Sequence, residues 1–293
     1  MLKVISTLNG FIQPLRSLHI VRCSARRYTL CPFYTHDTLQ SIRGYNILQL
    51  SLQHYPLNIL TSQFMESLTD FFNQIQDRSI SADALIIKSS IPMIYSAGLD
   101  LTELIINNNF DLDKCENYLT TFESFWLSLY CLDIPVLSLI EGDCLAAGCI
   151  IALSTDYRIM SDIDSKMGIN ATKVGITPPF WVCRLLSQAI GVSRADRAIQ
   201  LGTVFSPKEA LNIQLLDQVV SPKDCQAIAL SVAEKFLFVD SLARRTIKLR
   251  FREELISELK NRLNSDRNEL IRIISSDTTQ ERIRKLLKIT KIV

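Results

Sequence analysis

Residues 141–159 read EGDCLAAGCIIALSTDYRI, and an apolar run, Val136 to Ile140, precedes them. The apolar run predicts a buried strand, and a second strand is expected around Tyr157 to Met160. Between them, the residues from Ala146 to about Ser154 predict a short helix. Strands connected through a helix lie parallel in one sheet, so this stretch predicts an α/β fold with a mainly parallel sheet.

Strand and helix signals alternate on both sides of this stretch. Upstream, the pattern predicts a half-buried strand at 48–52, a helix behind a cap at Thr61 or Ser62, a buried strand at 84–87 and a second helix through 118–129. Downstream, helices are expected at 181–189, 194–201, 207–214 and 225–238. The charged tail from Ala243 has helical spacing, and it either exposes a solvated face or packs on a neighbouring subunit.

Composition excludes several classes of protein. The 293 residues are 47% hydrophobic and 21% charged, which fits a large buried core and excludes disordered, collagen and coiled-coil chains. The 32 basic and 30 acidic residues are too balanced for a protein whose main partner is nucleic acid. No uncharged apolar run approaches the ~20 residues of a membrane helix. The eight cysteines form no CxxC pair and only three histidines are present, so no metal site is expected.

The first 36 residues differ from the rest in charge. They contain Lys3 and four arginines but no acidic residue, as expected for a mitochondrial transit peptide, and the remainder has 27 basic against 30 acidic residues. An ordinary flexible basic terminus is the alternative. The expected division is a leader at 1–36, a core at 37–240 and a helical C-terminal region at 241–293 that serves oligomerisation. Such a leader predicts a location in the mitochondrial matrix.

Two loops are the candidates for chemistry. One runs from Tyr95 to Glu103 and the other from Glu141 to Cys149, and each follows an apolar strand. The carboxyl ends of parallel strands are where α/β proteins bind ligands. A helix that begins at Ala146 or Ala147 directs N–H donors at developing negative charge, and two converging donors form an oxyanion hole. The alternative is that these small residues only permit tight packing.

Four runs of sequence carry a resemblance to a known family. They are YSAGLDLTEL at 95–104, EGDCLAAGCIIALSTDYRI at 141–159, GINATKVGITPPFW at 168–181 and RADRAIQLG at 194–202. Over residues 46–240 the chain resembles the crotonase (enoyl-CoA hydratase/isomerase) superfamily, and within it the branch of mitochondrial 3,2-trans-enoyl-CoA isomerases of fatty acid β-oxidation. The resemblance implies a ClpP-like spiral of ββα units with a helical C-terminal region, assembled as a homotrimer or a hexamer.

The resemblance also implies a site for a fatty acyl-CoA thioester. In the family, two backbone N–H groups hold the thioester carbonyl and stabilise the enolate that forms when a proton leaves C2. Here these are the N–H groups of Leu99 and Ala147. CoA is part of the substrate, and no separate cofactor is implied. The substrate-binding residues that the resemblance implies are Ala97, Gly98, Leu99, Asp100, Leu101, Ala147 and Asn170.

The residue that transfers the proton in the family is replaced in this chain. In the isomerase branch, a glutamate that ends a Gly-(Leu/Ile)-Asn-Glu run moves the proton from C2 to C4. The corresponding run here is Gly168-Ile169-Asn170-Ala171, and a methyl group accepts no proton. The hydratase branch has a second glutamate after its Gly-Cys pair, where this chain has Ile150. Ala147 also replaces a usual glycine, a change that keeps the N–H donor.

Three functions stay open on the sequence. The first is an isomerase of unsaturated fatty acyl-CoA, for which Asp143 is the candidate substitute base, although a solvated or capping aspartate is the ordinary interpretation of that residue. The second is a non-catalytic acyl-CoA binder, or a subunit that lends its C-terminal helices to an oligomer. The third is another acyl-CoA reaction in which enolate stabilisation suffices and Asp143 or water takes the proton.

Overall fold

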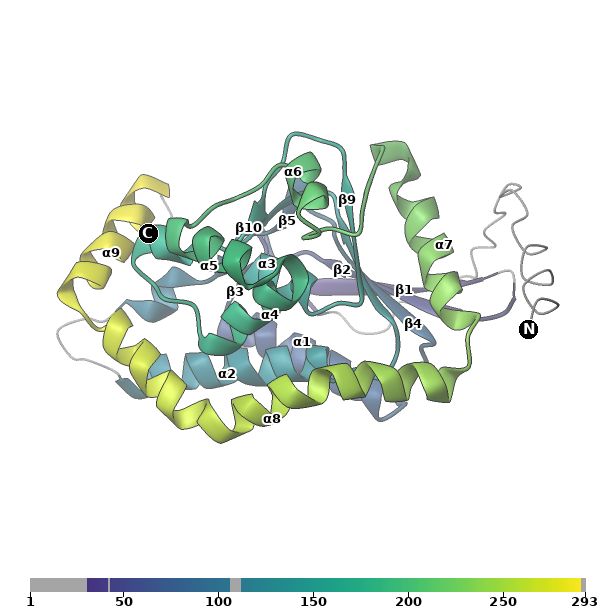
Figure 1. Cartoon of the computed structure of the whole chain (residues 1–293), viewed down its shortest axis with the longest axis horizontal. Coiled ribbons are helices and arrows are strands. Elements are labelled where there is room, and N and C mark those ends of the chain that lie inside the picture. Colours follow the sequence, from purple (N-terminus) through teal and green to yellow (C-terminus); the bar gives the residue numbers. More distant parts are fainter. Residues whose placement is uncertain (1–30, 42, 106–111, 291–293) are drawn as a thin grey trace.

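A six-stranded, mostly parallel sheet organises the structure (Figure 1). The structure is a computed structural model, and it describes residues 31–41, 43–105 and 112–290. The strand order is β1-β2-β4-β7-β9-β11, in which β1 and β2 pair antiparallel and the other neighbours pair parallel. The strands are β1 (Tyr34–Gln40), β2 (Asn46–Leu52), β4 (Ala84–Ser89), β7 (Val136–Ile140), β9 (Tyr157–Ser161) and β11 (Gln218–Val220).

The first strand changes the expected start of the core. β1 pairs with β2 along its whole length, from Tyr34 opposite Leu52 to Gln40 opposite Asn46. The expected boundary at residue 37 therefore falls inside a strand, and the sheet begins at Tyr34. β1 lies at the edge of the sheet and its sequence, YTHDTLQ, is largely polar, so it carries no apolar signal. The rest of the expected leader, residues 1–30, lies outside the described residues.

Each central strand is followed by a short strand that leaves the main sheet. β5 (Met93–Ser96), β8 (Gly142–Leu145) and β10 (Met167–Gly168) follow β4, β7 and β9, and they form a second sheet in the order β10-β8-β5. The next α-helices along the chain are α2 (Leu112–Tyr130), α3 (Ala147–Leu153) and α4 (Phe180–Ile190). This is the expected spiral of ββα units, and the short strands lie where the sequence predicted loops.

Helices cover the two faces of the main sheet unequally. Leu85 and Ile87 of β4 pack in the larger core with α1 (Ser62–Gln76) and α2, whereas Ala84 and Ile86 face α7 (Cys225–Leu237). This alternation follows from the two-residue period of a strand, and both faces are apolar because both are covered. The remaining elements are β3 (Ile59–Leu60), β6 (Gly98–Leu99), η2 (Leu101–Leu104), η3 (Ala171–Val174), α5 (Val192–Leu201), α6 (Pro207–Asn212) and η4 (Pro222–Asp224).

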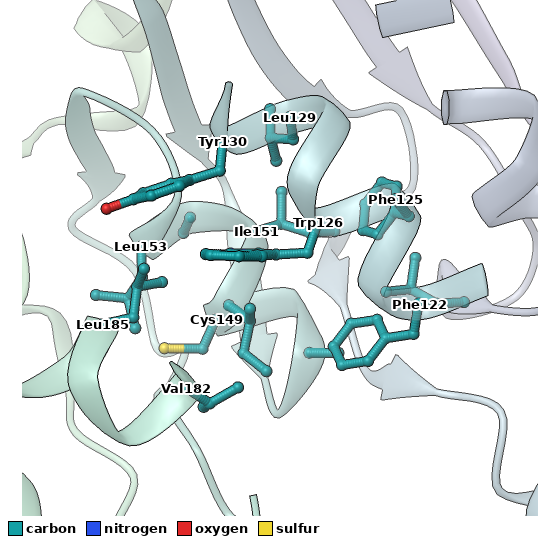
Figure 2. Packing of buried hydrophobic residues seen from close by; sticks show 14 of the residues in the cluster. Phe122, Phe125, Trp126, Leu129, Tyr130, Cys149, Ile151, Leu153, Val182 and Leu185 are labelled. Carbon is teal, nitrogen blue, oxygen red and sulfur yellow. The ribbon is translucent and has the colours of Figure 1, made fainter. Parts of the chain in front are cut away.

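Aromatic side chains fill the space between α2, α3 and α4 (Figure 2). Trp126 stacks on Tyr130 with ring centroids 4.7 Å apart, and the ring of Trp181 lies 4.3 Å from that of Trp126. Cys149 and Ile151 of α3 belong to the same buried cluster. Every residue of α3 is buried. Dense packing therefore fixes the position of this short helix, which begins at Ala147.

The C-terminal helices pack on their own chain. α8 (Ser241–Ile274) runs along the length of the molecule, and α9 (Asp277–Thr290) turns back at its far end (Figure 1). Leu255 and Leu259 of α8 and Ile283 of α9 are buried in the larger core. These helices therefore complete the core of this chain. Among the described residues, no helix is both long and apolar enough to cross a membrane.

A buried ion cluster attaches α8 to the sheet. The Asp156 carboxylate, which directly precedes β9, lies 2.7 Å from the Lys248 ammonium and 2.8 Å from the Arg252 guanidinium. Lys248 also donates to the Ile134 carbonyl at 2.6 Å, and Arg252 donates to the Ser154 carbonyl at 3.1 Å. Burial lowers the pKa of Lys248 to about 8, although the nearby carboxylate acts to raise it. One carboxylate is thus the counter-charge shared by two cations that packing has removed from water.

Replacing Asp156 with Asn should lower the free energy of unfolding by about 3 kcal/mol, because two buried cations then lose their counter-charge. Urea denaturation measures the loss. The matched control is Glu258→Gln, the same carboxylate-to-amide change in an exposed pair with Arg262, which should cost less than about 1 kcal/mol. Equal losses in the two variants would show that the cluster does not hold α8.

Candidate active site

A cavity of about 340 Å³ opens where the small strands β5 and β8 end. Aliphatic and aromatic side chains form most of its wall, as is usual for a site that buries an organic ligand. α2, the start of α3, the turn around η3 and the two C-terminal helices each contribute. The lining residues are Ala97, Leu99, Leu101, Leu104, Leu119, Phe122, Ala146, Ala147, Ile150, Ile169, Asn170, Ala171, Lys173, Val174, Ile176, Pro178, Pro179, Leu270, Ile274 and Leu286.

The two glycine-bearing turns meet at the cavity. A Cβ atom built on Gly98, which has φ +103°, would lie 2.7 Å from Ala146 Cβ and 2.9 Å from Ala147 N. A Cβ atom on Gly148 would lie 2.5 Å from the Ser96 carbonyl oxygen. Contacts this short leave no room for a side chain at either glycine. The absence of these side chains therefore lets the backbones of the two turns touch.

The start of α3 presents free backbone donors beside this contact. The first hydrogen bond of the helix runs from Ile150 N–H to the Ala146 carbonyl at 3.2 Å. The N–H groups of Ala147, Gly148 and Cys149 therefore precede the ladder and have no acceptor within the helix. Ala146 has φ +49°, a conformation that alanine rarely adopts, and it turns the chain sharply into α3.

The N–H group of Leu99 is directed away from β3. β6 pairs with β3 in the register Leu60 opposite Leu99, and Asp100 N–H donates to the Leu60 carbonyl at 3.3 Å. Successive N–H groups along a strand point to opposite edges, so the N–H of Leu99 faces the other way. The Tyr118 hydroxyl holds this turn, because it accepts from Asp100 N–H at 2.8 Å and donates to the Leu60 carbonyl at 2.6 Å.

The turn around η3 supplies the polar part of the wall. Asn170 precedes η3 and Ala171 begins it, and both line the cavity with Lys173. Asn170 and Lys173 are the polar side chains of the lining. No aspartate, glutamate, histidine or cysteine is among the described residues that line it. Where the family resemblance places a base, the structure has the methyl group of Ala171.

The structure does not place Asp143 at the cavity. Its Oδ1 accepts a hydrogen bond from Lys166 N–H at 2.8 Å, and Asp143 is absent from the lining. The expected substitute base is therefore wrongly placed for the reaction, because a base must come within hydrogen-bond reach of the proton that it takes. Asp100 and Gly98 do not line the cavity either, and the Asp100 carboxylate caps η2 by accepting from Thr102 N–H at 2.8 Å.

Other predicted residues do share the cavity. The structure brings together Ala97, Leu99, Leu101, Ala147, Asn170 and Ala171. Sequence reasoning missed the walls from α2, α8 and α9, which contribute Phe122, Leu270 and Leu286 among others. Phe122 lies in the helix that the sequence predicts through 118–129. Nothing in the local sequence indicates that Leu270 or Leu286 lines a cavity, since their positions depend on the path of the whole C-terminal region.

α9 is fixed to both turns beside the cavity. Gln280 donates through Nε2 to the Leu104 carbonyl at 2.9 Å, and Thr279 donates to the Gly175 carbonyl at 3.2 Å. Leu104 ends η2, and Gly175 directly follows η3. α9 therefore holds the two turns in place and adds Leu286 to the wall of the cavity.

The buried thiols near the site are not poised for chemistry. Burial raises the pKa of Cys149 to about 12, and it raises the pKa of Cys144 well above its usual value. A thiol reacts as the thiolate, so both cysteines stay protonated and unreactive at neutral pH. Neither lines the cavity. The chemistry of the site therefore rests on backbone donors and on apolar enclosure.

Comparisons with known proteins agree with this geometry. Residues 43–288 match the family described as enoyl-CoA hydratase/isomerase. The human protein named enoyl-CoA delta isomerase 1, mitochondrial, is 32% identical over 246 residues, which are 84% of this chain and 80% of that protein. The mouse protein of the same name is 33% identical over 244 residues, 82% of each chain.

Solved structures show the same relation. The crystal structure of human mitochondrial delta3-delta2-enoyl-CoA isomerase matches with a TM-score of 0.80 at 32% identity, over 84% of this chain and 94% of that one. An enoyl-CoA hydratase from Bacillus halodurans matches with a TM-score of 0.74 over 82% of this chain and 96% of that one. At 20% identity, the second match shows the fold alone.

Gly98→Ala should lower the free energy of unfolding by about 2 to 4 kcal/mol, since it adds a clash with Ala146 and Ala147 to the strain of a positive φ. Urea denaturation measures the loss. Gly44→Ala is the control, because Gly44 has φ +83° but no atom within 4 Å of its built Cβ, and only the strain of about 1 to 2 kcal/mol applies. If both variants lose the same amount, the turns do not depend on the close contact.

Proposed function

Because the chain belongs to the enoyl-CoA hydratase/isomerase family, we propose that it binds fatty acyl-CoA thioesters in this cavity and serves the isomerase step of fatty acid oxidation. In that step the double bond of a 3-enoyl-CoA moves to position 2. The relatives named mitochondrial enoyl-CoA delta isomerases support the reaction class and a mitochondrial location, which we place in the matrix. The transit peptide and a homotrimeric assembly belong to the same proposal.

The oxyanion hole is the part of the site that serves binding and polarisation. We assign the two donors to Leu99 N–H and Ala147 N–H. The close contact of Gly98 with Ala146 and Ala147 supports this pairing, because it holds the two donor-bearing turns together. Each such donor typically contributes ~10² to 10³ in rate when charge develops on the thioester oxygen. CoA enters as part of the substrate, and no further cofactor is needed.

The proton transfer is the part of the reaction that the cavity does not supply. A positioned general base typically contributes ~10² to 10⁴ in rate, and the described lining contains no carboxylate or imidazole. Removal of the C2 proton is then left to water. We therefore expect the unaltered chain to bind enoyl-CoA well and to isomerise it slowly. This composition of the lining is the observation that carries the proposal.

A second candidate function is binding without turnover. It is favoured by Ala171, since a cavity that polarises a thioester but has no carboxylate or imidazole in its described lining holds the ligand unchanged. The protein then acts as a carrier or a sensor of acyl-CoA. The two functions differ in one measurable quantity, the rate of isomerisation above the uncatalysed reaction.

Ala171→Glu should isomerise a trans-3-enoyl-CoA at least about a hundredfold faster than the unaltered chain, because it restores a proton carrier beside the two donors. The absorbance of the conjugated 2-enoyl thioester measures the rate. Ala171→Gln is the matched control, since it has the same size but accepts no proton, and it should stay at the unaltered rate.

Binding of decanoyl-CoA is measured on the same three proteins and should agree within about threefold, because the donors and the apolar wall are unchanged. Three results would contradict the proposal. They are no saturable binding of decanoyl-CoA, a fast unaltered chain that the glutamate does not improve, or equal rates in the glutamate and glutamine variants.

Asp143→Asn should leave decanoyl-CoA binding and the slow isomerisation within about twofold of the unaltered chain. The amide oxygen of Asn keeps the acceptor for Lys166 N–H, and the carboxylate does not line the cavity. The initial rate with a trans-3-enoyl-CoA is the measurement. A tenfold loss of rate with normal binding would return Asp143 to the role of base.

A further inference from the structure

A second cavity, of about 610 Å³, lies at the opposite ends of the strands from the acyl-CoA cavity. Ala82 and Asp83 directly precede β4, and Asp133 and Ile134 lie just before β7, so this cavity borders the amino ends of the parallel strands. The turn between α7 and α8 forms its outer wall, at the other end of α8 from α9 (Figure 1). The two cavities share no lining residue. A ligand in one cavity therefore does not contact the residues that line the other.

Three arginines give this cavity an excess of positive charge. Arg78, Arg244 and Arg245 line it with two carboxylates, Asp83 and Asp133. The Asp133 side chain is 5% exposed and lies 2.9 Å from Arg78 and 3.1 Å from Arg245. Each of these two ion pairs uses one guanidinium nitrogen, and a guanidinium has five N–H donors. Both arginines therefore retain donors for a further acceptor.

The arginines occupy positions that local preference disfavours. Arg78 follows the C-cap of α1 with φ +71°, where glycine is the usual residue. Arg244 and Arg245 are the fourth and fifth residues of α8, near the positive end of its dipole, and the first turn of that helix has no acidic residue. The positive end of the α8 dipole disfavours the charges of Arg244 and Arg245, whereas the C-terminal end of α1 favours the charge of Arg78. The N-cap carboxylate of Asp240 and the Asp133 carboxylate compensate only part of the charge at the start of α8.

Arg244 has a buried donor that no described residue pairs with. Its Nη1 donates to the Asp133 carbonyl at 3.3 Å, whereas its Nε is buried and has no hydrogen-bond partner among the described residues. Burial lowers the pKa of Arg244, although Asp156 and Asp133 act to raise it. A buried donor of a charged group is costly when it is left unpaired.

An apolar wall lies beside the arginines. It includes Phe236, Leu237, Val239 and Leu242. Val239 is 57% exposed and Leu242 is 68% exposed, which is high for side chains of this kind at a cavity. Apolar surface next to unpaired cationic donors matches a ligand with a hydrocarbon body and an anionic head.

We propose that this cavity binds the carboxylate of an amphipathic organic acid of the fatty acid class. The carboxylate engages the free N–H groups of Arg78, Arg244 and Arg245, and the hydrocarbon covers Val239 and Leu242. The arginines exceed the two aspartates by one charge, so a singly charged head balances them. Carboxylates also fit the planar guanidinium group in a bidentate manner. This site stands apart from the proposed function, and its test involves no acyl-CoA.

The test is a calorimetric titration of the full chain with octanoate, octanol and inorganic phosphate. Octanoate should bind saturably, and octanol and phosphate should each bind at least about tenfold more weakly, since each offers only one half of the recognised chemistry. Arg244→Gln should weaken octanoate binding about tenfold or more, the loss expected for a hydrogen bond to a charged group. Arg250→Gln, the same change on the same helix outside the cavity, should stay within twofold.

Leu242→Ser is a second variant, at an exposed position whose change spares the fold, and it should weaken octanoate binding about fivefold. If Arg244→Gln fails to fold, the affinity of Leu242→Ser for octanoate tests the proposal instead. Octanoate that binds in the acyl-CoA cavity would be insensitive to both changes. That outcome, no saturable binding of octanoate, or equal effects of Arg244→Gln and Arg250→Gln would overturn the proposal. Phosphate that binds as tightly as octanoate would overturn the choice of a fatty carboxylate.

Discussion

Backbone contact between successive ββα units is the constraint on which the candidate active site depends. A Cβ atom would lie 2.0 Å from the Met93 carbonyl carbon if it were built on Gly142, and 2.5 Å from the Ser96 carbonyl oxygen if it were built on Gly148. At such distances no other residue fits without displacing a strand. The small sheet closes on itself because these positions lack side chains, and Leu99 and Ala147 come to one cavity as a result. The packing of α3 beneath Trp126 then fixes the donors in place.

The sequence predicted those elements that are long enough to show a periodic pattern of apolar residues. Strands β2, β4 and β7 and helices α1, α2 and α4 lie where apolar periodicity predicts them, since each buries one face or all of its length. β3, β6 and β10 have two residues each, too few to show a period. In the site, the family resemblance predicted Ala97, Leu99 and Leu101, whereas Leu286 reaches the cavity only through the path of α8. The alternation of side chains along β8 decides the direction of the Asp143 side chain. Its neighbour Cys144 points into the core, so the Asp143 carboxylate points the other way and accepts from Lys166 N–H.

The cavity separates two tasks that an enolising enzyme combines. Polarisation of a thioester needs only donors at fixed positions, and backbone N–H groups supply them without any particular side chain. Proton transfer needs an ionisable group at one place, and where the family resemblance puts that group this chain has Ala171, which lines the cavity. The fold can therefore keep the first task while a single residue removes the second. The intact scaffold and the altered chemistry of this chain are compatible for that reason.

The wall that α9 adds to the cavity has a consequence for how the protein is made. Ala171 precedes Leu286 in the chain, so the central apolar walls of the cavity form before the last helix when folding proceeds from the N-terminus. Until α9 docks, the chain presents a hydrophobic hollow of the kind that chaperones bind. A shortened chain that ends before Asp277 lacks Leu286 and the bonds of Thr279 and Gln280 to the two turns, so this side of the hollow stays uncovered.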